Sequence, residues 1–149
     1  KIPGLKILAG DVRERLGIVS FYVEGIHYNL LVRLLNDLFG IQVRGGCACA
    51  GTYGHLLLEV THEKSQEITW KINHGDLSEK PGWVRWSLHP VAADHEIYAM
   101  INGLEYIVNH IGELKKQYQY DIHRNVFCHI HENPAVYTRL LDEWFDLDS

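Results

Sequence analysis

The residues best able to do chemistry lie in a glycine-rich stretch that spans positions 43–55. It holds two cysteines, Cys47 and Cys49, just after Arg44. The thiolate is the reactive form of cysteine, and a neighbouring cation favours it, so either residue could act as a nucleophile. Cysteine is also among the residues most often buried as small apolar side chains. Both could therefore be packing residues, an interpretation that applies more strongly to Cys128.

Zinc binding is an alternative chemistry for the same stretch, because zinc prefers sulfur and nitrogen ligands. The candidate ligands are Cys47, Cys49, His55 and His62. Structural zinc sites usually separate paired cysteines by about two to four residues, whereas one residue separates these two and no second pair exists. The spacing argues against zinc, and we expect no metal site. The other histidines are expected at the surface or in hydrogen bonds.

Arg85 is a second candidate, because it stands in the middle of an apolar and aromatic segment, 83–88. The alternation of a strand would place Trp83, Arg85 and Ser87 on one face. A guanidinium held rigidly by a strand can bind a carboxylate or phosphate through two parallel hydrogen bonds. Arg85 could therefore anchor an anionic substrate. An internal salt bridge, or an exposed position on the sheet, is the alternative.

The periodicity of the chain predicts the elements that position these residues. Segments expected as strands are 17–25, 41–44 and 83–88, and segments expected as helices begin at His27, Asp94 and Asn133. Residues 45–51 are expected to be irregular, 52–80 to hold loops with a short helix, and 118–131 shows no firm period. This order predicts an α/β (α+β) fold, a two-layer sandwich whose small mixed or antiparallel sheet is covered by helices mainly on one face.

Composition limits the function classes. The 149 residues, 46% of them hydrophobic, suit one compact domain, and a net charge of −5 disfavours nucleic-acid binding. No apolar run approaches the roughly 20 residues of a membrane span, and no signal-peptide pattern is present. Three cysteines are too few for a disulfide framework, so we expect a cytoplasmic protein. Because the chain opens at Lys1 and its only methionine is Met100, we expect a piece of a longer protein.

Three blocks of the sequence, in order, resemble the C-terminal small domain of class V aminotransferases. This group of fold-type I pyridoxal-phosphate enzymes includes cysteine desulfurases and selenocysteine lyases. The blocks are 15–21, 40–50 and 80–88. The middle block resembles the family loop Gly-Ile-x-Val-Arg-x-Gly-x-x-Cys-Ala, and the third resembles its Gly-x-x-Arg-x-Ser strand. The likeness covers roughly residues 15–112.

The resemblance implies a role for three residues of this chain. Cys49 falls on the loop cysteine that, in the desulfurases, attacks the substrate sulfur and becomes a persulfide. Arg85 falls on the arginine that holds the substrate α-carboxylate. Arg44 falls on the arginine before the loop, where it would help orient the loop or the cofactor side of the site.

The resemblance also implies a division of labour between two domains. Residues 1–149 would be the substrate-capturing small domain, and pyridoxal phosphate would be held by a large N-terminal domain that these residues do not include. The chain alone would then be inactive and would not bind the cofactor. Implied partners are the large domain, a second subunit of a homodimer and an amino-acid substrate, with no nucleic acid and no membrane.

The reaction stays open at this level. The desulfurases often have histidines or small polar residues where Cys47 and Ala48 stand, and the excursion 51–80 is longer here. Amino-group transfer or a lyase reaction would also use Arg85 while leaving Cys49 uncommitted. A function of another class is a non-catalytic α/β binding or regulatory module that shares the fold.

Overall fold

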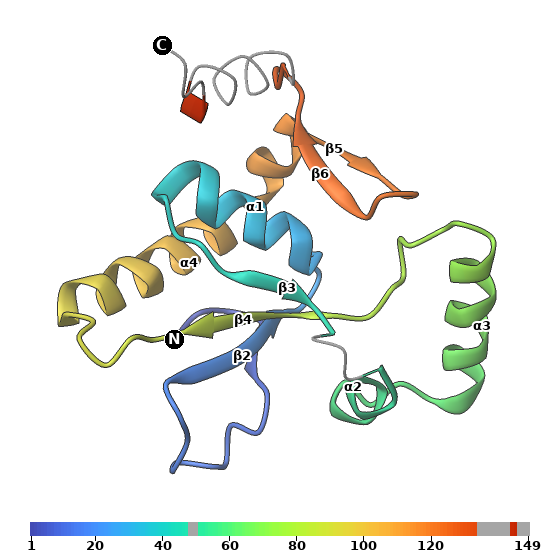
Figure 1. The fold of residues 1–149 in the computed structure, drawn as a ribbon, viewed down its shortest axis with the longest axis horizontal. Helices are drawn as coiled ribbons and strands as arrows, with labels where there is room; N and C mark the ends of the chain where they lie inside the picture. The colour runs from blue at the N-terminus through green and yellow to red at the C-terminus, as the bar shows by residue number, and fades with distance from the viewer. Residues whose placement is uncertain (48–50, 134–143, 146–149) are drawn as a thin grey trace.

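A four-stranded antiparallel sheet lies at the centre of the computed structural model, which describes residues 1–47, 51–133 and 144–145. Its strands are β1 (Leu5–Ile7), β2 (Ile18–Val23), β3 (Arg44–Gly46) and β4 (Trp83–Ser87), in the order β1-β2-β4-β3. Figure 1 shows β4 between β2 and β3. The register places Arg85 of β4 opposite Ser20 on one side and opposite Arg44 on the other.

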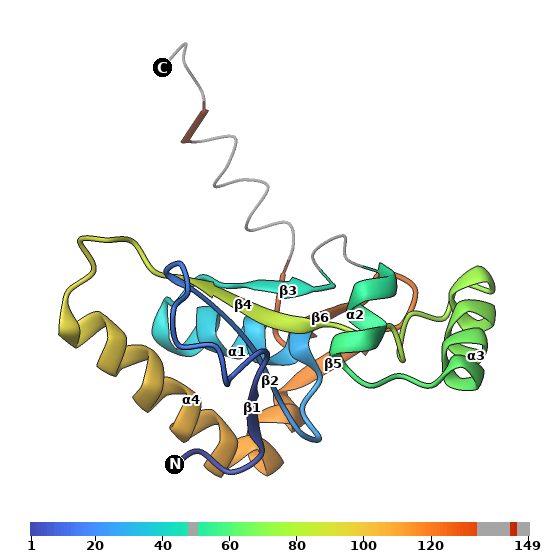
Figure 2. The same cartoon turned by 90° about the horizontal axis from the view of Figure 1, so that it is seen from below.

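Two amphipathic helices, α1 (Tyr28–Phe39) and α4 (Asp94–Leu114), lie on the same side of this sheet (Figure 2). Their apolar stripes meet the sheet residues Phe21 and Val84 in one core, as the helical spacing of leucines and isoleucines predicts. The fully buried side chains of this core include Leu31, Leu34, Leu35, Met100 and Ile107. The expected α+β class, with a small antiparallel sheet and its helices mainly on one face, is confirmed.

The ends of α1 explain where the chain turns toward the sheet. The backbone N–H of Asn29 donates to His27 Nδ1 at 3.1 Å, so His27 is the N-cap. Gly40 ends the helix in the left-handed conformation, φ 65°, with its N–H directed at the carbonyls of Asn36 and Leu35. At the start of α4, the backbone N–H of Ala93 donates to the Glu96 carboxylate at 2.8 Å.

The boundaries of β3 correct the expectation for this region. The strand begins at Arg44, whereas the sequence predicted a strand at 41–44, and it includes Gly45 and Gly46, which were expected to be irregular. Two glycines by themselves do not favour a strand, but pairing with β4 supplies the backbone hydrogen bonds that hold them in one. A side chain at Gly45 would collide with α1, since its Cβ would lie 2.8 Å from Asn29 Oδ1.

Two helices occupy the segment in which loops and one short helix were expected. They are α2 (Gly51–Leu57) and α3 (His62–Asn73). Only Ile68 of α3 is buried, so its sequence has no apolar stripe from which the helix could be predicted. It is supported by Thr61 at its N-cap and by the ion pair between Glu67 and Lys71, 3.0 Å apart.

A β-hairpin follows α4, where no firm period was found. The short 3-10 turn η1 (Lys115–Gln117) leads into β5 (Tyr118–Asp121), which pairs with β6 (Val126–His129). The helix expected from Asn133 lies outside the described residues, apart from the exposed Trp144 and Phe145. Within the described residues, no helix combines the length and the apolar character needed to cross a membrane.

Candidate anion-binding site

A pocket of about 340 Å³ is lined by residues of β3, the start of β4, the first turn of α1 and the β5–β6 turn. Its charged lining residues are Arg44, Lys80, Arg85 and Arg124. Among the described residues, no aspartate or glutamate lines it. In a chain with 14 lysines and arginines against 19 acidic residues, this is a local reversal of charge. The pocket therefore favours an anion.

The two arginines of the sheet carry the clearest electrostatic argument. Arg44 and Arg85 are direct partners in the β3–β4 register, and like charges placed opposite one another destabilise a sheet. Within the described part of the chain, neither guanidinium forms an ion pair, and the buried Nε of Arg85 has no hydrogen-bond partner. A buried donor without an acceptor is costly. An anion between the two guanidinium groups would remove both costs.

The first turn of α1 is tied to the β5–β6 turn across the pocket. Asn125, which is buried with φ 54°, donates from Nδ2 to the Tyr28 hydroxyl at 2.7 Å and accepts from the Tyr120 hydroxyl at 2.9 Å. The Asn29 side chain donates in turn to the Asn125 carbonyl at 2.5 Å. These bonds fix the backbone next to Arg124.

The loop between α3 and β4 is fastened to the same turn. The backbone N–H of Leu77 donates to the Ile122 carbonyl at 2.9 Å, and His123 Nδ1 lies 2.9 Å from the Gly75 carbonyl oxygen. Segments separated by nearly fifty positions in the sequence are thus joined directly. The loop carries Lys80 and the turn carries Arg124, so both cations face the pocket from connected walls.

Tyr28 supplies a neutral polar group to the wall. Burial raises the pKa of its hydroxyl above the ordinary value of 10.0, and the hydrogen bond from Asn125 only partly opposes this effect. The side chain therefore stays a neutral phenol throughout the physiological range. Because its oxygen accepts from Asn125, its own proton is available to an acceptor in the pocket.

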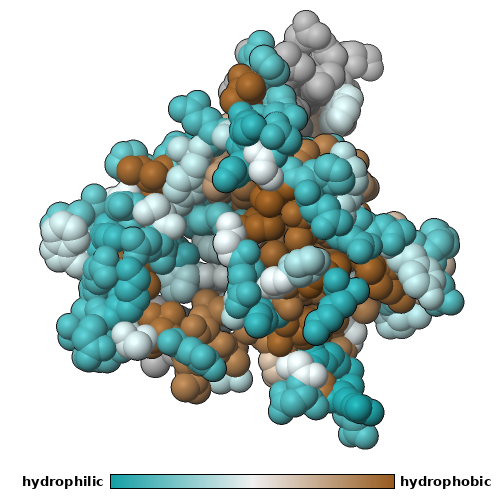
Figure 3. Space-filling view, turned by 180° about the vertical axis from the view of Figure 1, so that it is seen from behind, coloured by the Kyte–Doolittle hydropathy of each residue, from teal (hydrophilic) through white to brown (hydrophobic). Residues whose placement is uncertain are grey.

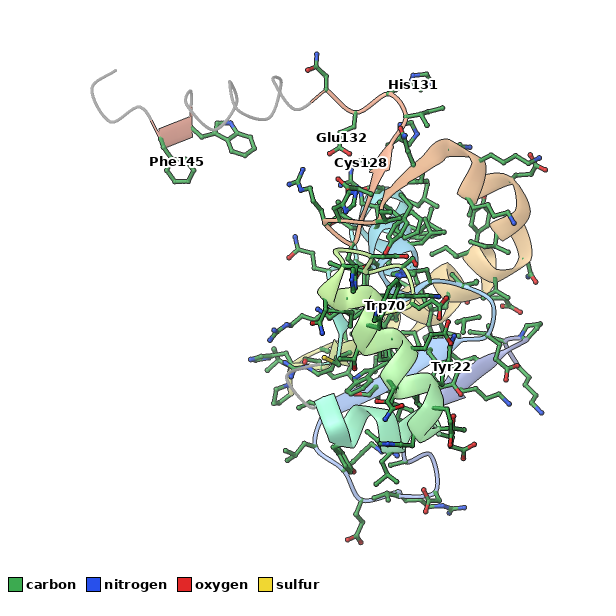
Figure 4. All side chains as sticks on the ribbon, turned by 90° about the vertical axis from the view of Figure 1, so that its right-hand side faces the viewer. Tyr22, Trp70, Cys128, His131, Glu132 and Phe145 are labelled. Atoms are coloured by element: carbon green, nitrogen blue, oxygen red, sulfur yellow. The ribbon has the colours of Figure 1, made fainter. Side chains whose placement is uncertain are left out.

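The structure brings together some of the residues that the sequence singled out. Arg44 and Arg85 line one pocket with Cys47, a half-buried free thiol, while Ser87 is exposed near the end of β4. Cys49, expected as a catalytic residue, lies outside the described residues. Cys128 is exposed on β6, at the hairpin end beside Glu132 and His131 and away from α3 (Figure 4).

Two lining residues were not predicted as site residues, Lys80 and Arg124. Lys80 precedes the Pro-Gly turn before β4, and Arg124 lies in a hairpin that the sequence did not predict. Nothing in the local sequence marks either residue, because their approach to Arg85 depends on the tertiary contacts described above. The four cations of the pocket form no ion pair within the described part of the chain, and they come together only when β3, β4 with the loop before it, and the β5–β6 turn are folded together.

The zinc alternative gains no support from the described residues. No group of three or more histidine, cysteine, aspartate or glutamate side chains comes together among them. His62 instead lies 3.1 Å from the Gln66 amide nitrogen. Two of the four candidate ligands, Cys49 and the His55 side chain, lie outside what is described.

No known family model matches this chain, and no curated protein matches it. The chemistry of the site is therefore argued from its geometry. Arginine presents a planar fork of donors that matches a carboxylate, and two such forks face one pocket here. Among the described lining residues, Cys47 is the only thiol and no carboxylate is present. The arrangement is suited to binding an anion.

Proposed function

We propose that this chain captures the carboxylate of an amino-acid substrate as the small domain of a pyridoxal-phosphate enzyme of the class V aminotransferase type. One observation carries the proposal: Arg85, whose buried Nε has no partner among the described residues, lies directly opposite Arg44 in a pocket with no acid among its described lining residues. These are the two arginines to which the sequence resemblance gives roles, Arg85 at the substrate α-carboxylate and Arg44 beside the loop or the cofactor side of the site.

In this proposal each residue of the pocket has a defined task. Arg85 binds the α-carboxylate, since its strand β4 is hydrogen-bonded between β2 and β3 and so holds the residue in place. Arg44 binds or orients the same anion from β3, and the neutral Tyr28 hydroxyl can donate a further hydrogen bond. A charge-assisted hydrogen bond between arginine and carboxylate is worth roughly 1.5–3 kcal/mol, so two of them would dominate the binding of a small ligand.

Pyridoxal phosphate, where bound, acts as an electron sink for bond breaking at the amino-bearing carbon of the substrate. The described lining residues do not provide a carboxylate to pair with its pyridine nitrogen, so they do not fit this cofactor by themselves. In the proposal, the large domain supplies that acid, the Schiff-base lysine and the phosphate site. The 149-residue chain supplies the substrate side.

A partner domain also needs a surface on which to dock. Large hydrophobic side chains are exposed on α4, among them Tyr98, Ile101 and Tyr106. Apolar side chains gather across the middle of the face that carries this helix (Figure 3). Broad exposed apolar areas commonly mark contacts with another domain or subunit, which supports the proposed large domain and homodimer.

Titration with L-alanine tests the proposal for this chain, with backbone amide NMR signals as the readout. We expect shifts around β3, β4 and the first turn of α1, and we expect Arg85→Gln to weaken binding at least about tenfold, the equivalent of roughly 1.4 kcal/mol. Arg13→Gln, which removes an exposed cation elsewhere, is the matched control and should bind normally. Unchanged binding by Arg85→Gln would contradict the assignment.

A second candidate function is a non-catalytic anion-binding module, which a pocket with no acid among its described lining residues would serve equally well. The two candidates predict different properties for the full-length protein. A pyridoxal-phosphate enzyme shows visible absorbance from the bound cofactor, and a binding module does not. Cys49→Ser in that protein separates the possible reactions, because loss of sulfide release supports persulfide chemistry, whereas full activity excludes a required thiol.

A further inference from the structure

The pocket contains more positive charge than a single carboxylate requires. An amino acid such as alanine carries one carboxylate, which Arg85 and Arg44 can neutralise between them. Lys80 and Arg124 line the same pocket and add two further cations. If only one anionic group entered, these two charges would remain unbalanced beside the first pair.

The acidic residues nearest in sequence do not neutralise this second pair. Glu79, which precedes Lys80, accepts hydrogen bonds from Lys64 and Lys71 of α3. The Nζ atoms of both lysines also lie 3.0 Å from the carboxylate of Glu67. Glu79 therefore belongs to a separate ion-pair cluster with these two lysines and Glu67. Lys80 is therefore left without an acidic partner within the described residues.

The same holds for Arg124. The carboxylate of Asp121 accepts from the backbone N–H groups of His123 and Arg124, at 2.9 and 3.1 Å, and so serves to close the β5–β6 turn. The Arg124 guanidinium forms no ion pair with any described residue. It is exposed at the pocket, on a turn fixed by the hydrogen bonds of Asn125.

We infer that Lys80 and Arg124 form a second anion-binding subsite, and that the substrate is an amino acid with an acidic side chain. The α-carboxylate would bind Arg85 and Arg44, and the side-chain acid would bind Lys80 and Arg124. This inference rests on the proposed function and specifies its substrate class. A pocket of about 340 Å³ lies at the small end of the roughly 300–1,000 Å³ range of ligand sites, as a single amino acid requires.

Pairs of ligands that match in shape but differ in charge test the inference. L-Aspartate is compared with L-asparagine, and L-glutamate with L-glutamine, by NMR titration of the chain at low ionic strength. We expect at least one acidic member to bind about tenfold more tightly than its amide. Lys80→Gln and Arg124→Gln should each reduce that preference severalfold, because each weakens binding of the acid far more than binding of the amide.

Charge-conserving variants separate a subsite from a structural role. Arg124→Lys and Lys80→Arg should retain most of the preference, whereas the general surface control Arg13→Gln should retain all of it. The amide spectrum of each variant shows whether the fold is intact. If Arg124→Gln disturbs the turn, Lys80→Gln still tests the subsite from the other wall.

The possible failures are distinguishable. Equal affinity for aspartate and asparagine and for glutamate and glutamine, with both members of each pair dependent on Arg85, would overturn the second subsite and leave the proposed function standing. Affinity independent of Arg85 would instead contradict the proposed function. Inorganic phosphate is added as a competitor in a separate titration. If it displaces nothing from Arg85 but binds at Lys80 and Arg124 while neither acid is preferred, that region is a phosphate site and the inference fails.

Discussion

His27 links the start of α1 to its aromatic surroundings, and its titration is a property of a single residue. Its ring stacks on Tyr28, with centroids 4.6 Å apart, and also lies against Tyr120 and Phe127. Nδ1 accepts the N-cap hydrogen bond, so the proton of the neutral ring is on Nε2, which is buried and has no partner among the described residues. Burial lowers the pKa of His27 below the ordinary value of 6.5.

This lowered pKa predicts a loss of stability in acid. Below about pH 6.5 the unfolded chain takes up a proton at His27 before the folded chain does, so the free energy of unfolding falls as the pH decreases. The contribution is fully present above pH 6.5, and the loss is complete below the folded-state pKa. His27→Asn keeps a cap acceptor without a titrating ring. Urea unfolding between pH 7.5 and 5 should therefore show a shallower decline for this variant.

A matched histidine controls for the other imidazoles of the chain. His95→Asn alters an exposed residue in the first turn of α4 and should leave the pH dependence of unfolding as in the wild type. If the free energy of unfolding falls with pH equally in His27→Asn and in the wild type, His27 is not the cause of the acid destabilisation.

Single residues were predicted unevenly, and the reason is geometric. Arg85 could be found from sequence because an arginine in an apolar strand is unusual in itself. That Arg44 lies opposite it follows from the β3–β4 register, which the sequence does not reveal across about forty intervening residues. Lys80 and Arg124 are ordinary loop cations until the chain is folded. Two of the four cations of the candidate site, Arg44 and Arg85, were therefore predicted from the sequence around them. Lys80 and Arg124 were not.

The β5–β6 hairpin is the element that closes the pocket, and Asn125 holds it in place. Replacing Asn125 with glycine keeps a residue that tolerates φ 54° but removes two side-chain hydrogen bonds and leaves the buried Tyr28 hydroxyl without its donor. At about 1 kcal/mol per hydrogen bond, we expect a loss of about 2 kcal/mol in the free energy of unfolding. Tyr120→Phe removes one of the bonds and should cost about half as much, by urea unfolding.

If Asn125→Gly and Tyr120→Phe lowered the free energy of unfolding equally, the two hydrogen bonds of Asn125 would not contribute separately as proposed. No effect of Asn125→Gly would mean that the hairpin is held by other contacts, such as the partly buried Phe127 against the core. Amide exchange around residues 118–129 then reports whether the hairpin itself has loosened.

Elements were predictable where one face is apolar along a whole stretch. The stripes of α1 and α4 and the alternation of β4 satisfy this condition, and all three were confirmed. The helix α3 buries only Ile68, and β1 has three residues, so neither shows a period. Both are stabilised by partners elsewhere in the chain: β1 pairs with β2, and ion pairs join Lys64 and Lys71 of α3 to Glu79.

At the scale of the whole molecule, two electrostatic influences on an acidic ligand oppose each other. The net charge of −5 repels it from a distance, whereas the cations of the pocket attract it at short range. Added salt weakens the interactions of exposed charges, and most strongly those beyond the Debye length, about 10 Å at 0.1 M. The salt dependence of binding therefore shows which influence dominates.

If the pocket cations dominate, the preference for aspartate over asparagine decreases as salt rises from 20 to 300 mM. The reason is that a second charge contact at partly exposed Lys80 and Arg124 is screened, while the contact common to both ligands cancels in the ratio. We expect the ratio of the two dissociation constants to fall severalfold over this range, as measured by NMR titration. Lys80→Gln should flatten the dependence, whereas Arg13→Gln should not. A preference that grows with salt would mean that repulsion by the whole acidic molecule outweighs the local pocket.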